Sequence, residues 1–223
     1  MMVRERDRAL VATPLLVFDR DGVLIDSEPV KRASFEAAVA ETCRLDEAAL
    51  AGVSTYNAAS RGVPRDQKIA HVLRDILKLP ESLAPAVAAC YARKLAAGLP
   101  SCAPVRGVSA FLSAVDARFY VASSAPEPEI RSNLERHDLL CHFAGIFGHP
   151  LTKAAVLSYL RRAHAGADVV FFGDAVADLE AAEGAGVRFV AVNPNAMLRL
   201  RVSRWVPDFH DIDQVLDLAL GPP

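Results

Sequence analysis

The stretch Leu15-Leu16-Val17-Phe18-Asp19-Arg20-Asp21-Gly22-Val23-Leu24 decides the fold of this chain. Its apolar first half has the character of a buried strand, and two carboxylates one residue apart follow it at once. Because residues i and i+2 of an extended chain face the same side, Asp19 and Asp21 are expected to converge on one point. Gly22 then lets the chain turn away without the steric penalty of a Cβ atom. Taken alone, the stretch fits a ligand site at a strand end and a plain turn about equally well.

Length and composition narrow the classes of protein to consider. A chain of 223 residues allows one large domain or a core with a smaller accessory domain. It is 52% hydrophobic and 23% charged, which is typical of a soluble globular protein. A net charge of −2 argues against a nucleic-acid or membrane-surface partner, and no apolar run approaches the ~20 residues of a membrane span.

The start of the chain and its cysteines indicate the cellular compartment. Residues 1–8 mix both charges and contain no apolar segment, so we expect a short solvated extension and no secretory signal. Cysteines 43, 90, 102 and 141 are widely spaced, which speaks against a zinc site or a disulfide framework. We therefore expect reduced thiols in a cytoplasmic protein.

Strand and helix patterns alternate over most of the chain. After residues 15–19, strands are predicted over 118–123, 143–148, 169–173, 188–193 and 205–206. Helices are predicted over 108–115, 127–137, 153–163, 176–185 and 212–220. Because the strands are continuously apolar, the pattern predicts an α/β fold with a parallel sheet covered by helices on both faces.

One segment interrupts this alternation directly after the first strand. Between Pro29 and Pro100 only helices are predicted, over 31–43, 46–51, 66–79 and 82–98, with a polar loop over 54–64. Asp26 or Ser27 is expected to cap the first of them, with Pro29 in its first turn. The segment is best interpreted as an inserted helical domain, residues 27–100, within a core made of residues 1–26 and 101–223.

Polar side chains fall at the ends of the predicted strands. They are Asp19, Asp21, Ser123, Ser124, Asp174 and, in the helices that follow, Lys153 and Asp178. Because the carboxyl ends of parallel strands share one edge, these groups are expected to meet. Acids, a hydroxyl and a lysine suit a hard cation together with an anion, and Mg²⁺ with a phosphate fits best. Asp19, Asp174 and Asp178 are the natural metal ligands.

The same residues can carry out phosphoryl transfer. A carboxylate such as Asp19 can attack phosphorus, and Asp21 can give a proton to the leaving oxygen and later take one from water. Lys153 would neutralise the transferring group and Ser123 would hydrogen-bond it. The structural alternatives are turn and cap roles for the acids, an N-cap role for Ser124 and a helix-dipole role for Asp178.

The order of these motifs resembles the haloacid dehalogenase superfamily. Phe18-Asp19-Arg20-Asp21-Gly22-Val23 looks like its first motif, Val121-Ala122-Ser123 its second, Lys153 its third, and Gly173-Asp174 with Asp178 its fourth. The resemblance spans nearly the whole chain and is strongest to the phosphoglucomutase and phosphoglycolate phosphatase branch. It implies a Rossmann-like core, a helical cap inserted after the first motif, Mg²⁺ and an aspartyl-phosphate intermediate. It also implies that the backbone carbonyl of Asp21 belongs to the metal shell.

Two departures from this branch concern the substrate. Arg20 stands where most members have an apolar residue, and Lys31 stands where the sugar-phosphate mutases have a histidine. Gly62-Val63-Pro64-Arg65 is similar to the cap segment of the phosphoglucomutase-like members, and by that match Arg65 holds a substrate anion. Ser124, Arg65, Lys31 and Gly22 are the candidate substrate-binding residues.

The leading hypothesis is a cytoplasmic Mg²⁺-dependent phosphatase of a small phosphorylated metabolite such as a sugar phosphate. A sugar-phosphate mutase is the first alternative, and the missing histidine places hydrolysis ahead of it. Phosphonate cleavage through Lys31 and a catalytically idle binding protein stand further behind. Dehalogenation needs no metal, so Asp174 and Asp178 speak against it. The sequence leaves a monomer and a homodimer equally open.

Overall fold

A six-stranded parallel sheet forms the centre of the molecule. The computed structural model describes residues 13–60, 63 and 65–222. The strands are β1 (Leu15–Phe18), β2 (Arg118–Pro126), β3 (Phe143–His149), β4 (Val169–Gly173), β5 (Arg188–Val192) and β6 (Trp205–Val206). Their order is β3-β2-β1-β4-β5-β6, and all neighbouring pairs are parallel. The chain thus winds outward in both directions from β1, and the direction reverses between β1 and β4.

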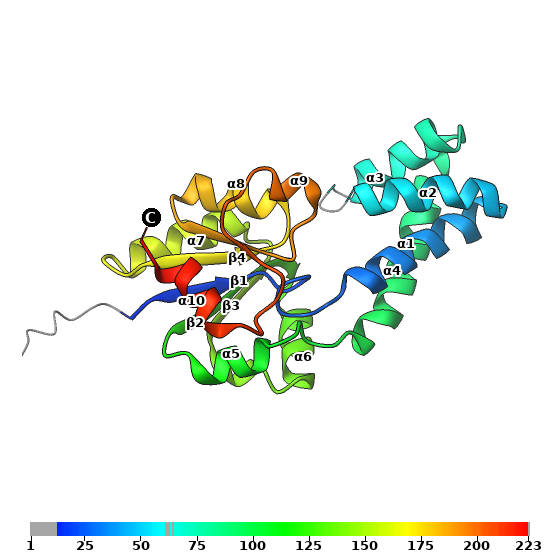
Figure 1. Cartoon of the computed structure of the whole chain (residues 1–223). Coiled ribbons are helices and arrows are strands. Elements are labelled where there is room, and N and C mark those ends of the chain that lie inside the picture. The colour runs from blue at the N-terminus through cyan, green and yellow to red at the C-terminus, as the bar shows by residue number, and fades with distance from the viewer. Residues whose placement is uncertain (1–12, 61–62, 64, 223) are drawn as a thin grey trace, which may run out of the picture.

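Helices cover both faces of this sheet, as Figure 1 shows. They are α5 (Val108–Ala114), α6 (Glu127–Arg136), the short η4 (Leu140–His142), α7 (Lys153–Ala163), α8 (Val176–Ala185), α9 (Ala196–Arg199) and α10 (Ile212–Leu220). Side chains of β1 alternate between the two faces. Leu16 and Phe18 pack with α5, α6 and α10, whereas Leu15 and Val17 pack with α7 and α8. This pattern is why a continuously apolar strand lies at the centre of the sheet.

A separate group of helices lies between β1 and β2 in the sequence and beside the sheet in space (Figure 1). It consists of α1 (Glu28–Cys43), α2 (Glu47–Ala59), α3 (Arg65–His71), the π-helical η1 (Val72–Ile76), the 3-10 turn η2 (Glu81–Leu83), α4 (Ala84–Gly98) and the 3-10 turn η3 (Leu99–Ser101). These helices share a hydrophobic cluster of their own, with Phe35, Val53, Leu73 and Tyr91 among its buried members.

The elements follow the predicted order, with a few corrections. The polar loop predicted over 54–64 is wrong in its first half, because α2 continues to Ala59. Asn57, a residue typical of loops, is buried in this helix and donates hydrogen bonds to the carbonyl of Arg32 and to the carboxylate of Glu36 in α1. The short helix predicted over 46–51 is therefore 13 residues long, as α2.

Three further details were not predicted. Strand β2 extends to Pro126, η1 interrupts the helix predicted over 66–79, and the short α9 lies in a stretch without a predicted element. The predicted extension at residues 1–8 and most of the cap segment 61–64 lie outside the described residues. Among the described helices, none combines the length and the apolar character that a membrane span requires.

Candidate active site

The reversal point between β1 and β4 carries two buried acids. Asp19 follows β1 directly, and its backbone N–H donates to the carbonyl of Phe172 in β4 at 2.9 Å. Asp174 follows β4 directly, so both side chains lie at the same carboxyl edge of the sheet. Both residues are buried. This edge, at the point where strand order reverses, is the usual ligand site of open α/β sheets.

Asp178 joins these two acids from the first turn of α8. Its Oδ2 accepts hydrogen bonds from the backbone N–H groups of Asp174 at 3.1 Å and Ala175 at 3.2 Å. Gly173 makes this approach possible, because a Cβ atom there would lie 2.4 Å from the Cβ of Asp178. The carboxylate of Asp178 therefore fixes the loop that carries Asp174.

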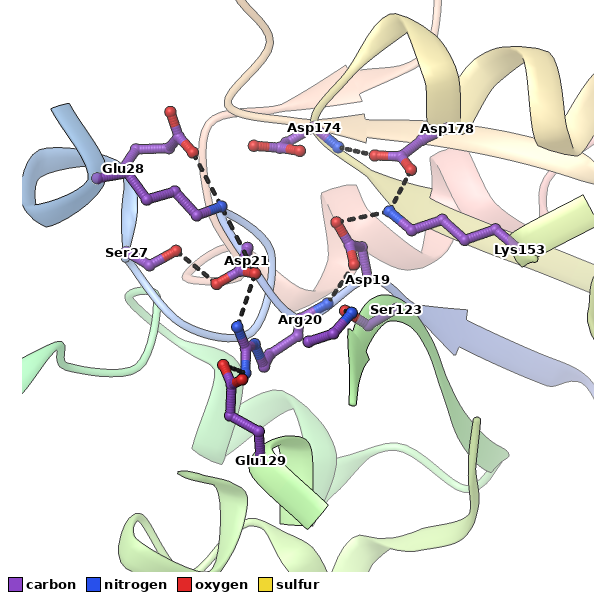
Figure 2. A network of polar contacts seen from close by, with 12 residues as sticks. Asp19, Arg20, Asp21, Ser27, Glu28, Ser123, Glu129, Lys153, Asp174 and Asp178 are labelled. Atoms are coloured by element: carbon purple, nitrogen blue, oxygen red, sulfur yellow. Dashed lines mark hydrogen bonds and ion pairs between the residues drawn. The ribbon is translucent and has the colours of Figure 1, made fainter. Parts of the chain in front are cut away.

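Lys153 links two of the acids. It is the first residue of α7, whose N-cap Thr152 accepts a hydrogen bond from the backbone N–H of Ala155. The Lys153 Nζ lies 2.8 Å from Oδ2 of Asp19 and 2.5 Å from Oδ1 of Asp178 (Figure 2). Burial acts to lower the pKa of Lys153, but the two carboxylates outweigh it and raise that pKa. The ammonium group is therefore charged throughout the physiological range.

The acids need more positive charge than Lys153 supplies. Burial raises the pKa of Asp19 to about 6, and the negative charges of Asp178 and Asp21 add to this effect while Lys153 opposes it. Carboxylate oxygens of Asp19, Asp174 and Asp178 all lie within 4.8 Å of one another. Three carboxylates against one ammonium leave an excess of two negative charges when all are ionised. A hard divalent cation with oxygen ligands, such as Mg²⁺, fits this donor set.

Asp21 lies in a different environment from Asp19. Its Oδ1 accepts a hydrogen bond from the Ser27 hydroxyl at 2.7 Å, and its Oδ2 lies 2.9 Å from Arg20 (Figure 2). The same Oδ2 lies 3.5 Å from Lys31. Burial would raise the pKa of Asp21, but Lys31, Arg20 and the bond from Ser27 outweigh it and lower that pKa to about 2. Ser27 is at the N-cap position of α1, but its side chain makes no capping hydrogen bond, because its hydroxyl donates to Asp21 instead.

Arg20, which sequence reasoning left without a role, connects the first motif to α6. Its side chain is 5% exposed and bonds Asp21 through Nη2 and Glu129 through Nη1, at 2.9 and 2.7 Å. The Nε atom is buried without a hydrogen-bond partner among the described residues. No sequence signal pairs Arg20 with a residue 109 positions away, so this contact could be found only in the structure.

The two serines of the second motif differ in position. Ser123 lies in β2 beside β1, where Phe18 pairs with Val121, and it is buried. Its Oγ accepts a hydrogen bond from the backbone N–H of Ala125 at 3.3 Å. Ser124 is exposed and lines two cavities at this edge of the sheet.

The smaller of these cavities, about 350 Å³, brings most of the predicted residues together. Asp19, Asp21, Lys153, Asp174 and Asp178 line it from the sheet. Lys31 and Arg65 line it from the helices α1 and α3, and Arg65 lies 4.8 Å from the ring centre of Tyr91. The larger cavity of about 630 Å³ shares Asp21, Lys31, Arg65, Tyr91 and Ser124 with it.

Two predicted residues do not reach the described lining of either cavity. Ser123 lies behind it, and Gly22 forms the turn after Asp21 instead, with a φ of 76° and an N–H bond to the carbonyl of Ile25. A glycine is favoured there because other residues rarely adopt this φ. Gly22 therefore allows the chain to turn after Asp21.

Sequence reasoning missed Lys68 and Asn57, which also line the smaller cavity. The Nζ of Lys68 donates to Oδ1 of Asn57 at 2.7 Å and lies 5.0 Å from the ring centre of Phe35. Burial lowers the pKa of Lys68. A signal was available, because Lys68 lies in the helix predicted over 66–79 and only three residues after Arg65, a spacing that places two side chains on the same face of a helix.

Comparison with known proteins places the fold among described families. A family model described as a haloacid dehalogenase-like hydrolase matches residues 13–186. No curated protein matches the chain. A predicted phosphoglycolate phosphatase from Haemophilus somnus has a TM-score of 0.71 and 20% identity, covering 91% of this chain and 97% of the other.

Two further solved structures share the fold. A candidate beta-phosphoglucomutase from Thermotoga maritima has a TM-score of 0.63 and 22% identity, covering 93% of this chain and 100% of the other. CbbY from Rhodobacter sphaeroides, solved in complex with phosphate, has a TM-score of 0.58 and 18% identity, covering 90% of this chain and 96% of the other. At these identities, the likeness concerns the fold.

Proposed function

The chain belongs to the haloacid dehalogenase-like hydrolase family, and from this premise we propose that it is a Mg²⁺-dependent phosphatase of a small phosphomonoester. One observation carries the proposal. The buried carboxylate of Asp19 lies between the backbone N–H of Arg20 at 2.7 Å and the ammonium of Lys153 at 2.8 Å, beside two further buried acids. This is an oriented nucleophile next to a cation site, as phosphoryl transfer requires.

In the proposed reaction Asp19 attacks phosphorus, and the bond from phosphorus to the leaving oxygen breaks. Asp21, which takes up a proton as the negatively charged substrate binds beside it, gives that proton to the leaving oxygen. Water then attacks the aspartyl-phosphate, Asp21 takes the proton from this water, and Asp19 and inorganic phosphate are released. The contacts of Asp21 with Lys31, Arg20 and Ser27 favour its ionised form, which is the form that the second half needs.

The acids around Asp19 bind the metal and orient Lys153 in this proposal. We assign Mg²⁺ to Asp19 and Asp174, with the backbone carbonyl of Asp21 that the family resemblance implies. When bound, the metal neutralises negative charge on the phosphoryl oxygens. The three hydrogen bonds to Asp178 occupy three of the roughly four lone-pair sites of a carboxylate. Asp178 therefore mainly orients Lys153 and the Asp174 loop, and one site stays available toward the metal.

Lys153 and the serines bind the phosphoryl group in this proposal. Lys153 is already held in the cavity by Asp19 and Asp178, so little side-chain freedom is lost when a phosphoryl oxygen arrives. By its place in the second motif we also assign Ser123 a hydrogen bond to this group, although it is buried and lines neither cavity in the structure. Ser124, which lines both cavities, contacts the rest of the substrate together with Lys31 and Arg65.

We further propose that residues 27–100 form a cap domain over a core of residues 1–26 and 101–223. The separate hydrophobic cluster of the helices between β1 and β2 supports this division. So does the cavity, whose walls come from the sheet edge on one side and from α1 and α3 on the other. The four cysteines are free thiols, which agrees with a cytoplasmic enzyme acting on a phosphorylated metabolite.

Release of phosphate from a panel of phosphomonoesters, including p-nitrophenyl phosphate, tests the proposal. We expect release with Mg²⁺ and none with excess EDTA. If no substrate of a broad panel releases phosphate with Mg²⁺, the proposal is wrong. Isomer formation from a sugar phosphate without net phosphate release would favour a mutase instead, to which Lys31, in place of the mutase histidine, is a counter-argument.

A further inference from the structure

The carboxylate of Asp21 is held by three side chains that come from two parts of the fold. The Ser27 hydroxyl donates to its Oδ1 at 2.7 Å, and Nζ of Lys31 lies 3.5 Å from its Oδ2. Both of these residues belong to the start of α1. The third contact comes from the loop after β1, where Nη2 of Arg20 donates to Oδ2 at 2.9 Å (Figure 2). Because Asp21 lines both cavities, these contacts determine how its carboxylate faces a bound substrate.

Arg20 is itself held from α6. Its Nη1 donates to Oε1 of Glu129 at 2.7 Å, so one guanidinium bonds an acid through each of its two terminal nitrogens (Figure 2). A guanidinium is planar and rigid, and fixing one of these nitrogens therefore fixes the direction of the other. The Arg20 side chain is also buried, which limits its movement. The orientation of the Asp21 carboxylate therefore depends on Glu129, a residue of a helix that follows β2.

The loop after β1 does not need the Arg20 side chain to keep its shape. The N–H groups of Leu24 and Ile25 both donate to the backbone carbonyl of Arg20 at 2.9 Å, and the N–H of Gly22 donates to the carbonyl of Ile25 at 2.8 Å. Nε of Arg20 is buried without a partner among the described residues, a cost that an apolar side chain would not carry. What the guanidinium adds to this loop is the direction of the Asp21 carboxylate.

We propose that Glu129, acting through Arg20, is a positioning residue that directs the Asp21 carboxylate toward the oxygen that leaves phosphorus. This inference rests on the phosphatase function proposed above and adds a residue to it. When the bond from phosphorus to that oxygen breaks, the electron pair stays on the oxygen and the proton of Asp21 moves to it. An alkoxide needs this proton in order to leave, whereas a nitrophenolate is stable without it. A misdirected Asp21 carboxylate should therefore slow the release of an alkoxide selectively.

Two phosphates with a similar ring and different leaving oxygens test the proposal. Benzyl phosphate releases an alkoxide oxygen, and p-nitrophenyl phosphate releases a nitrophenolate. The quantity compared is kcat/KM, which includes the departure of the leaving oxygen but not the later attack of water. In Glu129→Ala we expect kcat/KM for benzyl phosphate to fall by about tenfold or more, a part of what general acid catalysis contributes. For p-nitrophenyl phosphate the change should be smaller than about twofold, because no proton transfer is lost.

Two further variants separate the direction of the guanidinium from its charge. Glu129→Gln keeps an oxygen that can accept a hydrogen bond from Nη1 of Arg20, so it should retain most of the wild-type kcat/KM for benzyl phosphate. Arg20→Lys keeps the positive charge but replaces the two terminal nitrogens with one, so it should show the same selective loss as Glu129→Ala. If Arg20→Lys keeps the wild-type ratio of the two kcat/KM values, charge alone is sufficient and the positioning role is wrong.

Glu127→Ala is the matched control. Glu127 also lies in the first turn of α6 and pairs with Arg131, and its side chain is 44% exposed against 46% for Glu129. Unlike Glu129, it lines neither cavity and has no described contact with Arg20. This variant should keep both wild-type values of kcat/KM. Melting curves of each variant exclude unfolding as the cause of a change.

The outcomes separate this proposal from the proposed function. A wild-type ratio of the two kcat/KM values in Glu129→Ala, or a selective loss that Glu127→Ala shares, overturns the positioning role and leaves the phosphatase standing. If the wild-type protein hydrolyses neither phosphate, crystal structures of the wild-type protein and of Glu129→Ala decide. A rotated Asp21 carboxylate in the variant supports the positioning role, and an unchanged one overturns it. The phosphatase fails only if no phosphomonoester of the broad panel is hydrolysed with Mg²⁺.

Discussion

At the scale of single residues, Asp19 and Asp21 show how two acids in one motif acquire different properties. Asp19 is buried among carboxylates, which raises its pKa to about 6. Asp21 is also shielded from water, but two cations and a hydroxyl lower its pKa to about 2. The sequence alone predicts the pair and its convergence. It does not predict the difference, because Arg20 and Lys31 could be assigned to Asp21 only once their side chains were placed.

The raised pKa of Asp19 predicts how metal binding depends on pH. The folded protein holds the Asp19 proton more tightly than the unfolded chain does, so this group's contribution to stability decreases as pH rises from about 4 through 6. Mg²⁺ competes with that proton, so its apparent affinity should fall by about tenfold per pH unit well below pH 6. Tm measured with and without Mg²⁺ from pH 5 to 8 checks this.

We expect the Mg²⁺-induced rise in Tm to be small at pH 5 and to reach its full size above pH 6. In Asp19→Asn the rise should be much smaller at every pH, because an amide is a weaker ligand than a carboxylate. A rise that is the same at pH 5 and pH 8 in the wild-type protein would show that Asp19 does not take part in metal binding.

Replacing Arg20 is predicted to lower the stability of the folded protein strongly. Arg20→Met removes a buried cation that bonds Asp21 and leaves that carboxylate with one cation fewer, so the free energy of unfolding should fall by about 3 kcal/mol. Glu129→Gln is the matched control. Glu129 is 46% exposed, so this change should cost less than about 1 kcal/mol. Urea unfolding measures both, and equal losses in the two variants would contradict this account of Arg20.

The cavity residues that come from the helices could be predicted from the sequence only in part. Lys31 and Arg65 could be proposed by comparison with a family motif, and both line the cavity. Lys68 was overlooked because its position depends on a hydrogen bond to Asn57 in another helix, and the sequence places Asn57 in a predicted loop. Contacts between residues brought together by the tertiary fold leave no periodic pattern in the sequence.

At the scale of elements, the α/β part of the chain follows closely from its sequence. The predicted bounds of α7, α8, β4, β6 and α10 agree with the structure. These elements have strong apolar patterns and clear breaks. Prediction was weaker for α2, whose polar Ser54, Thr55 and Asn57 hide its helical character, and for the four-residue α9. In α2, the hydrogen bonds of Asn57 to α1 and α3 are tertiary contacts that override local preference.

Replacing Gly173 is predicted to disturb the active site by shifting the start of α8. In Gly173→Ala the new Cβ would lie 2.4 Å from the Cβ of Asp178, so the start of α8 must shift and Asp178 loses its bonds to the Asp174 loop. We expect kcat to fall by at least about 100-fold, the scale of a misplaced catalytic group. Steady-state kinetics with the best substrate of the panel measures this.

Gly184→Ala is the control, because Gly184 lies in α8, the helix that Gly173→Ala is expected to shift. Gly184 has no atom within 4 Å of an added Cβ, so alanine should raise the free energy of unfolding by about 0.5–1 kcal/mol and leave kcat unchanged. If Gly173→Ala is as active as Gly184→Ala, the close approach of Asp178 to β4 is not needed for the reaction.

At the scale of the whole molecule, acidic and basic side chains lie on opposite sides of one cavity. The sheet edge holds the acids and Lys153, and α1 and α3 hold Lys31, Arg65 and Lys68. Lys31, which lies 3.5 Å from Asp21, links the two sides. The inserted position of the helices was predictable from the missing strands between Pro29 and Pro100. The cavity between them and the sheet was not, because it depends on how two separately packed parts meet.

The most direct test of the central claim, that Asp19 attacks phosphorus, is the phosphate-release rate of Asp19→Asn with Mg²⁺. The exposed first-turn residue Asp213 in α10 provides the matched control, Asp213→Asn. We predict no detectable turnover for Asp19→Asn and wild-type turnover for Asp213→Asn, with both variants folded by their melting curves. Wild-type turnover by pure, folded Asp19→Asn would contradict the account.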